Sequence, residues 1–186
     1  MIIISKQYFG VNIKKCKFLG QGYEGKVYLT PDNRVLKIFK DKKKCNNEYE
    51  LLKIVEGSKY FPKAIGINEY SMIREYVSGT PLEAYVKKKG LSRKLGLSLI
   101  NLIEEFRRLG FTRLDMAARH IYVQTNEDIK VIDPRKCYVK EMSFPQLLLT
   151  DLDKINHLDD FIKVLIEERP TLAEEWIEGL NKLSQN

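Results

Sequence analysis

Three closely spaced glycines, Gly20, Gly22 and Gly25, interrupt a region of the chain that otherwise favours extended backbone. Strand-like patterns of apolar and β-branched residues lie on both sides of them, at residues 11–19, 26–30 and 34–39. We therefore expect the glycines to join two antiparallel strands. This position argues against a dinucleotide site of the Rossmann type, in which the same glycine spacing leads from a strand into a helix.

The chain divides at a second group of turn-forming residues, Ser78-Gly79-Thr80-Pro81. Apolar periodicity predicts helices at 46–56, 82–89, 92–109, 151–167 and 171–183, with short strands at 121–124 and 129–133. Asn46 or Asn47 is the expected N-cap of the first helix. We predict an α+β chain with two lobes. A small antiparallel sheet with one helix occupies residues 1–77, and a reduced helical lobe occupies residues 78–186.

Composition restricts the class of protein. No apolar run approaches the 18 residues of a membrane span, and the run after Met1 is too short for a signal peptide, so we expect a cytoplasmic protein without a membrane partner. The three cysteines form no CxxC pair, which favours reduced thiols. The net charge is +7, although residues 151–186 carry nine acidic and only four basic side chains. A basic body attracts nucleotides, nucleic acid or an acidic membrane, and the alternative is solubility alone.

The glycine loop continues into Val27, which completes the spacing Gly-x-Gly-x-x-Gly-x-Val. On a hairpin this pattern has a mechanism. Backbone N–H groups approach phosphates closely where no Cβ intrudes, and the valine packs against a base. The alternative is that the glycines serve only as turns.

Lys37 lies inside an apolar strand, between Leu36 and Ile38, where a lysine also fits an exposed, solvated strand face. A cation on the packed face of a strand needs an anionic partner. Glu48 lies three, four and seven positions before apolar residues of the expected helix, so it projects from the packed face of that helix. We predict a Lys37–Glu48 ion pair that directs the lysine ammonium at phosphates, with Glu50 as the competing partner.

Two aspartates in the second half of the chain complete the set. Asp115 lies in the segment Arg113-Leu114-Asp115-Met116-Ala117-Ala118-Arg119-His120, and Asp133 ends the apolar strand eighteen residues further on. An unpaired carboxylate at the end of such a strand is costly, and a divalent cation would relieve that cost. Each aspartate taken alone also fits a cap or a turn.

These elements resemble, in their order and spacing, the protein-kinase-like superfamily, over the range from Gly20 to Asp133. The resemblance implies a phosphotransferase that uses ATP with Mg²⁺ or Mn²⁺. It assigns Lys37 to the phosphates, Asp115 to the role of catalytic base and Asp133 to the principal metal ligand. It also places a hinge at Glu75 to Val77, whose backbone would meet adenine. The residues expected to bind the nucleotide are Gly20, Gly22, Gly25, Val27, Lys37, Glu48, Glu75 and Val77.

The chain departs from the family pattern at several positions. His120 stands where the second metal ligand is usually asparagine, and we expect it either to contact metal or phosphate or to orient the loop. Proline follows Asp133, which favours extended backbone at the aspartate. Arg74 falls where the residue that gates the adenine pocket is usually apolar. Only 53 residues follow Asp133, so the chain resembles the compact atypical kinases, such as RIO-type and short bacterial kinase-like proteins.

We expect transfer to serine or threonine of a protein acceptor or of the chain itself. One alternative is a nucleotide-binding pseudokinase that acts as a regulator or scaffold. Another is a kinase-like ATPase associated with nucleic acid. The basic runs Lys40-Asp41-Lys42-Lys43-Lys44 and Lys87-Lys88-Lys89 fit either an exposed face or a contact with RNA or an acidic protein.

Overall fold

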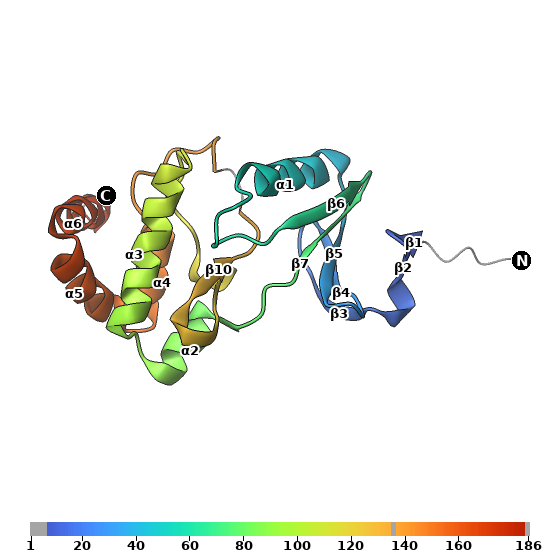
Figure 1. Ribbon diagram of the computed structural model, residues 1–186. Helices are drawn as coiled ribbons and strands as arrows, with labels where there is room; N and C mark the ends of the chain where they lie inside the picture. The colour runs from blue at the N-terminus through green and yellow to red at the C-terminus, as the bar shows by residue number, and fades with distance from the viewer. Residues whose placement is uncertain (1–6, 135–136, 185–186) are drawn as a thin grey trace, which may run out of the picture. The chain divides into compact units, whose positions relative to one another are not determined.

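The computed structural model describes residues 7–134 and 137–184 (Figure 1). The start of the chain, where we expected no signal peptide, lies outside the described residues, as does Arg135 after the Asp133-Pro134 pair. The chain is α+β and divides into two compact units, Met1–Val77 and Ser78–Asn186. In the part of the chain that is described, no helix combines the length and the apolar character needed to cross a bilayer.

The first unit is built on a five-stranded antiparallel sheet in the order β3-β4-β5-β7-β6. Its strands are β3 (Lys17–Gln21), β4 (Gly25–Leu29), β5 (Arg34–Phe39), β6 (Ala64–Asn68) and β7 (Ser71–Glu75). A separate two-stranded ladder pairs β1 (Gln7–Tyr8) with β2 (Val11–Asn12). The predicted hairpin around the glycines is confirmed, because β3 and β4 pair antiparallel.

The strand expected at residues 11–19 is not continuous. A 3₁₀ turn, Ile13–Lys15, separates β2 from β3. The side chain of Asn12 accepts a hydrogen bond from the Lys14 backbone N–H at 3.0 Å, which caps this turn. Such local side-chain bonds compete with strand pairing, and this competition explains the break.

Helix α1 (Lys42–Ile54) begins four residues before its expected start. Its N-cap is Asp41, whose carboxylate accepts from the Lys44 backbone N–H at 2.9 Å, and neither Asn46 nor Asn47 caps it. Lys42, Lys43 and Lys44 of the first basic run therefore form the first turn of a helix. The buried face of α1 packs against β5, β6 and β7 and includes Glu48.

The second unit combines a three-stranded antiparallel sheet with five helices among its described residues. The strands, in the order β10-β9-β8, are β8 (Thr80–Pro81), β9 (Ile121–Val123) and β10 (Ile129–Val131). The helices are α2 (Leu82–Lys89), α3 (Arg93–Arg108), α4 (Gln146–Lys154), α5 (Leu158–Glu168) and α6 (Pro170–Ser184). Ser92 caps α3, and Gly96 lets α3 approach α5 closely, since a Cβ there would lie 3.0 Å from the Val164 side chain.

The prediction of a single helix at residues 151–167 is wrong. The chain forms α4 and α5, separated at Asn156, whose φ of 58° lies in the left-handed region. Asparagine tolerates this conformation better than most residues, so it ends one helix and redirects the chain. Trp176 belongs to the core of this unit: it is fully buried, and its ring stacks on Phe161 with centroids 6.3 Å apart.

Candidate functional site

The predicted ion pair between β5 and α1 is present in the first unit. Lys37 Nζ lies 2.5 Å from Glu48 Oε2, and both residues are buried, with 6% and 7% of their surface exposed. Glu50, the competing partner, is exposed. The lysine also lies over the Phe39 ring, 4.7 Å from its centroid. Its ammonium group is therefore held in one direction by an anion and an aromatic face.

The pair changes the chemistry of its surroundings. Burial, followed by the Glu48 charge, raises the pKa of the Cys45 thiol to about 11. Cys45 is fully buried, and its thiol donates to the Asn68 carbonyl at 3.8 Å. This cysteine is a structural thiol, because reactive cysteines need a depressed pKa and access to solvent.

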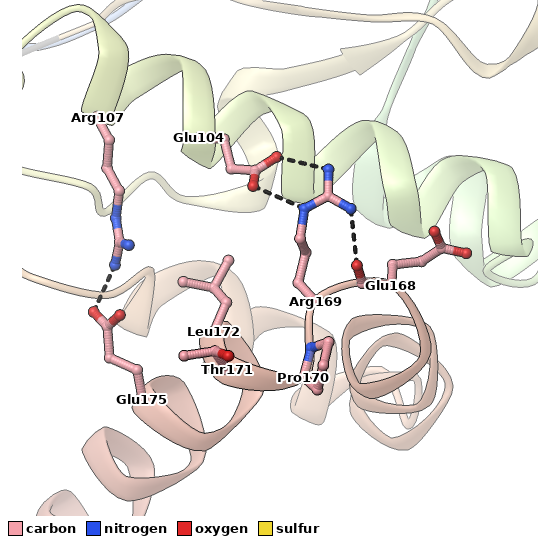
Figure 2. A pocket seen from close by; sticks show the side chains of 8 residues that line it. All are labelled: Glu104, Arg107, Glu168, Arg169, Pro170, Thr171, Leu172 and Glu175. Atoms are coloured by element: carbon pink, nitrogen blue, oxygen red, sulfur yellow. Dashed lines mark hydrogen bonds and ion pairs between the residues drawn. The ribbon is translucent and has the colours of Figure 1, made fainter.

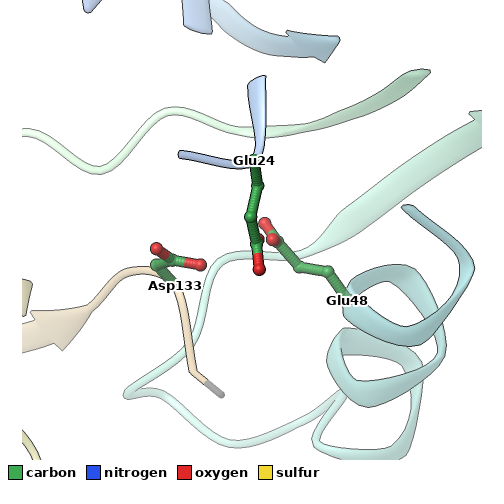
Figure 3. A group of neighbouring side chains, drawn as sticks. All are labelled: Glu24, Glu48 and Asp133. Carbon is green, nitrogen blue, oxygen red and sulfur yellow. The ribbon is translucent and has the colours of Figure 1, made fainter. Parts of the chain in front are cut away.

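Glu24, in the glycine loop, was not identified from the sequence. One of its carboxylate oxygens lies within 4.8 Å of one from Glu48, and the two side chains point toward each other (Figure 3). Lys44 Nζ lies 3.9 Å from Glu24 Oε1 and also covers the Tyr23 ring at 4.5 Å. The only sequence signal for Glu24 is its place directly before Gly25. Its approach to α1 depends on how the hairpin folds over the helix.

The three glycines of the loop differ in whether the surrounding atoms leave room for a side chain. A Cβ on Gly25 would lie 1.9 Å from the Ile38 carbonyl oxygen, so the pairing of β4 with β5 already requires glycine there. A Cβ on Gly20 or Gly22 would have no atom within 4 Å. Packing within the protein therefore explains only Gly25. The other two glycines leave backbone open to a close ligand.

The remaining residues predicted to bind the nucleotide have mixed surroundings. Val27 pairs with Lys37 in the ladder between β4 and β5, so both side chains project from the same face of the sheet. The Glu75 N–H donates to the Lys63 carbonyl at 2.9 Å, and the Glu75 carbonyl accepts from Arg74 Nη1 at 2.9 Å. An adenine contact through Glu75 would have to share these groups. Val77 is buried, with 4% of its surface exposed.

A cavity of about 260 Å³ lies in the second unit and brings three predicted site residues together. Asp115, His120 and Asp133 come from the loop after α3, from the 3₁₀ turn Ala118–His120 and from the segment after β10. The other residues that line the cavity are Arg113, Met116, Ala117, Arg119 and Leu147. Residues that lie up to 34 positions apart in the chain thus share one recess.

Asp115 is a buried carboxylate with defined partners. Its Oδ1 accepts from the Leu147 backbone N–H at 2.6 Å, and its Oδ2 lies 3.6 Å from Arg113 Nη2. Burial raises the pKa of the Asp115 carboxyl, while the Leu147 and Arg113 contacts lower it by less. A more basic carboxylate is better suited to accept a proton. The Leu147 bond also gives Asp115 a second role, because it satisfies an N–H in the first turn of α4.

Asp133 does not have the extended backbone that we expected before proline. Its φ is 58°, in the left-handed region, where aspartate is tolerated better than most residues. The preceding Ile132 donates its N–H to the His120 carbonyl at 2.8 Å, and the His120 N–H donates to the Ala117 carbonyl at 3.0 Å. The first bond ties the end of β10 to the 3₁₀ turn, and the second closes that turn. The tertiary fold thus overrides the local preference and holds Asp133 at the cavity.

Asp151 on α4 is a second residue that the sequence did not reveal. Its Oδ2 accepts from the Ala118 backbone N–H at 3.0 Å, and Lys154 Nζ lies 3.3 Å from its Oδ1. The bond holds the loop that carries Asp115 and His120 against α4. An acidic residue on an amphipathic helix gives no sequence signal for such a role.

Comparison with known proteins identifies no relative, so the geometry of the site is the main evidence for function. No family model matches the chain, and no curated protein shows significant similarity to it. Within the first unit, the described residues bring together the glycine loop, Lys37, Glu48 and Glu24. Within the second, they bring together Asp115, His120 and Asp133.

Proposed function

We propose that this chain is an ATP- and divalent-metal-dependent phosphotransferase with a kinase-like fold, acting on serine or threonine hydroxyl groups of a protein or of the chain itself. The observation that carries the proposal is the cavity of the second unit, lined by Asp115, His120 and Asp133. A buried carboxylate of raised pKa can accept a proton, and a second carboxylate with an imidazole offers ligands for a metal ion.

Asp115 is assigned to the acceptor hydroxyl. The hydroxyl oxygen forms a bond to the γ-phosphorus as the bond from phosphorus to the ADP oxygen breaks, and the hydroxyl proton passes to the Asp115 carboxylate. The Leu147 N–H orients this carboxylate through Oδ1. Orientation of the reacting groups is the main contribution that a protein makes to phosphoryl transfer.

Lys37 is assigned to the phosphate oxygens. An ammonium group has three N–H donors and binds phosphate as a point charge. Glu48 fixes its direction through the 2.5 Å contact. The open backbone at Gly20 and Gly22 supports the same assignment, since a phosphate can approach N–H groups there without meeting a Cβ.

Asp133 and His120 carry donor atoms of the types that bind divalent cations. Both residues line the cavity, and both are only partly buried. Carboxylate oxygen suits Mg²⁺ and Mn²⁺, whereas imidazole nitrogen suits Mn²⁺ better. When bound, the cation would offset negative charge on the phosphoryl oxygens. The pair therefore predicts activity with Mn²⁺ at least as high as with Mg²⁺.

The test is transfer of the γ-phosphate of radiolabelled ATP in Mg²⁺ and in Mn²⁺, with both released phosphate and labelled protein measured. Asp115→Asn and Asp133→Asn should each abolish transfer. Asp153→Asn is the matched control, because Asp153 is exposed on α4 and does not line the cavity. Equal activity in all four proteins would overturn the proposal.

A nucleotide-binding pseudokinase is the second candidate, and two sets of contacts favour it. The Asp115 carboxylate already binds Leu147 and Arg113, and the Glu75 backbone groups already bind within the first unit. This alternative predicts nucleotide binding that Lys37→Met weakens, without release or transfer of phosphate in either metal.

A further inference from the structure

The arginines of the second unit show a pattern that the proposed function leaves unexplained. All but one of those that the structure describes have a carboxylate within ion-pair distance. These are Arg93 with Glu167 and Glu168, Arg107 with Glu175, Arg108 with Glu105, Arg113 with Asp115, and Arg169 with Glu104. Arg119 is the exception among the described residues, and it lines the cavity that contains Asp115.

In a second cavity of the same unit, the arginines are paired with carboxylates in the usual way. This cavity has a volume of about 410 Å³ and lies beside the start of α6 (Figure 2). Arg169 binds Glu104 through two hydrogen bonds of 2.9 and 3.2 Å, and Arg107 binds Glu175 at 2.5 Å. Charges in this cavity are matched by neighbouring side chains, so it does not require an ionic ligand.

The charged side chains that line the cavity of Asp115 are paired differently. Arg113 and Arg119 supply two positive charges, and Asp115 and Asp133 supply two negative ones. Arg113 lies against Asp115, and the proposed function uses Asp133 for a cation. Arg119 is exposed, and its guanidinium is the cationic group on this lining that has no carboxylate of the described residues within ion-pair distance. A guanidinium binds carboxylate or phosphate through two parallel hydrogen bonds.

We propose that Arg119 selects acceptors that carry an oxyanion, carboxylate or phosphate, next to the hydroxyl group that receives the phosphoryl group. The inference rests on the proposed function and names its substrate class. Asp115 takes the proton of the acceptor hydroxyl, and Arg119, on the same lining, binds the neighbouring anion. Substrate choice thus depends on an exposed cation beside a buried base.

Binding of three synthetic peptides tests this without requiring phosphoryl transfer. Each peptide contains one serine, flanked by glycine, by aspartate or by phosphoserine. Dissociation constants are measured by calorimetry with full-length protein saturated with Mg²⁺ and ADP, at fixed salt concentration. The aspartate and phosphoserine arms separate the two sources of the anion. Wild type should bind at least one anionic peptide about ten-fold or more tighter than the glycine peptide.

Three variants decide where that preference arises. Arg119→Met should remove it, and Arg119→Lys should restore part of it. Arg108→Met is the matched control, because Arg108 is an exposed arginine of the same unit that does not line the cavity. General attraction of acidic peptides to a basic protein would be reduced equally by Arg119→Met and Arg108→Met, so it is distinguished from a specific site.

The outcomes separate this inference from the proposed function. A wild type without a preference, or an Arg119→Met variant that keeps the preference, overturns the inference even if transfer is observed. A weaker affinity of Arg119→Met for ATP, with unchanged peptide preference, also overturns it, because Arg119 then serves the nucleotide. An Arg119-dependent preference in a protein that transfers no phosphate supports the anion site and counts against the proposed function alone.

Discussion

Replacing Lys37 by methionine tests how far the buried ion pair stabilises the first unit. The charged atoms lie 2.5 Å apart, and the two side chains are 8% and 6% exposed. Methionine keeps most of the lysine stem and removes the charge. The Glu48 carboxylate then stays buried without the Lys37 cation, and the Glu24 carboxylate within 4.8 Å adds repulsion.

The burial of both side chains determines how much free energy of unfolding is lost in the Lys37→Met variant. An exposed ion pair contributes about 0–1 kcal/mol, whereas removal of one partner of a buried pair costs about 3–5 kcal/mol. The larger range applies to Lys37→Met. Each kcal/mol lowers Tm by about 4–8 °C in a unit of this size, so Tm should fall by at least about 12 °C.

The assay must report on the first unit. The single tryptophan, Trp176, belongs to the second unit, so its fluorescence is the wrong probe. Calorimetry combined with amide hydrogen exchange in α1 measures the relevant stability. Lys26→Met is the matched control, since Lys26 is exposed on β4, and it should change stability by less than about 0.5 kcal/mol.

A double variant separates lost charge from lost packing. Lys37→Met combined with Glu48→Leu should recover most of the stability, because apolar replacement of a whole buried pair is often neutral or stabilising. A Lys37→Met protein as stable as the Lys26→Met control would refute the reasoning. So would a double variant no more stable than Lys37→Met alone.

Three further predictions concern the glycine loop, the N-cap of α1 and the buried carboxylate of Asp115. Gly25→Ala should destabilise the first unit by about 1–3 kcal/mol in calorimetry, because its Cβ would meet a strand carbonyl at 1.9 Å, whereas Gly22→Ala should leave Tm unchanged and weaken ATP binding. Asp41→Ala should cost about 1 kcal/mol through loss of the α1 cap, and Asn46→Ala, at one of the two positions expected from the sequence to be that cap, should cost nothing. Asp115→Asn should be at least as stable as wild type at neutral pH while inactive. Burial raises the pKa of the Asp115 carboxyl, so the stability that protonated Asp115 contributes in wild type is present at acid pH and is lost as pH rises through that raised pKa. Unfolding curves across the acid range should therefore show wild type gaining on the variant as pH falls, and the opposite trend would count against the assigned burial.

The sequence predicted those features that leave a local anomaly. Lys37 interrupts an apolar strand and Glu48 lies on the apolar face of a helix, and each requires a partner, so their pairing follows from periodicity. Gly25 could not be distinguished from Gly20 and Gly22, because the difference arises from the pairing of β4 with β5. Spacing along the chain identifies a loop, but it does not show which glycine serves the fold.

Other features depend on contacts that a local pattern does not contain. Asp41 was not predicted as the N-cap of α1, because the lysines around it indicated an exposed basic face. The apolar period continues across Asn156, so the break between α4 and α5 gave no signal, although asparagine is a residue that tolerates positive φ. The residue before a proline usually has an extended backbone, and this preference gave the wrong prediction for Asp133. Its φ is 58°, and the hydrogen bond from the Ile132 N–H to the His120 carbonyl fixes the preceding residue.

Helix α4 and the loop that carries Asp115 hold each other in place. Asp115 accepts from the Leu147 N–H in the first turn of α4, and Asp151, one turn later in that helix, accepts from the Ala118 N–H in the loop. Both bonds join a carboxylate to a backbone N–H, but they run in opposite directions, so a shift of either element breaks both. The position of the proposed base is therefore set by a helix more than thirty residues further along the chain. Asp151→Ala removes the acceptor and leaves the cavity lining intact, so amide hydrogen exchange should rise in the loop at Ala118 more than in α4.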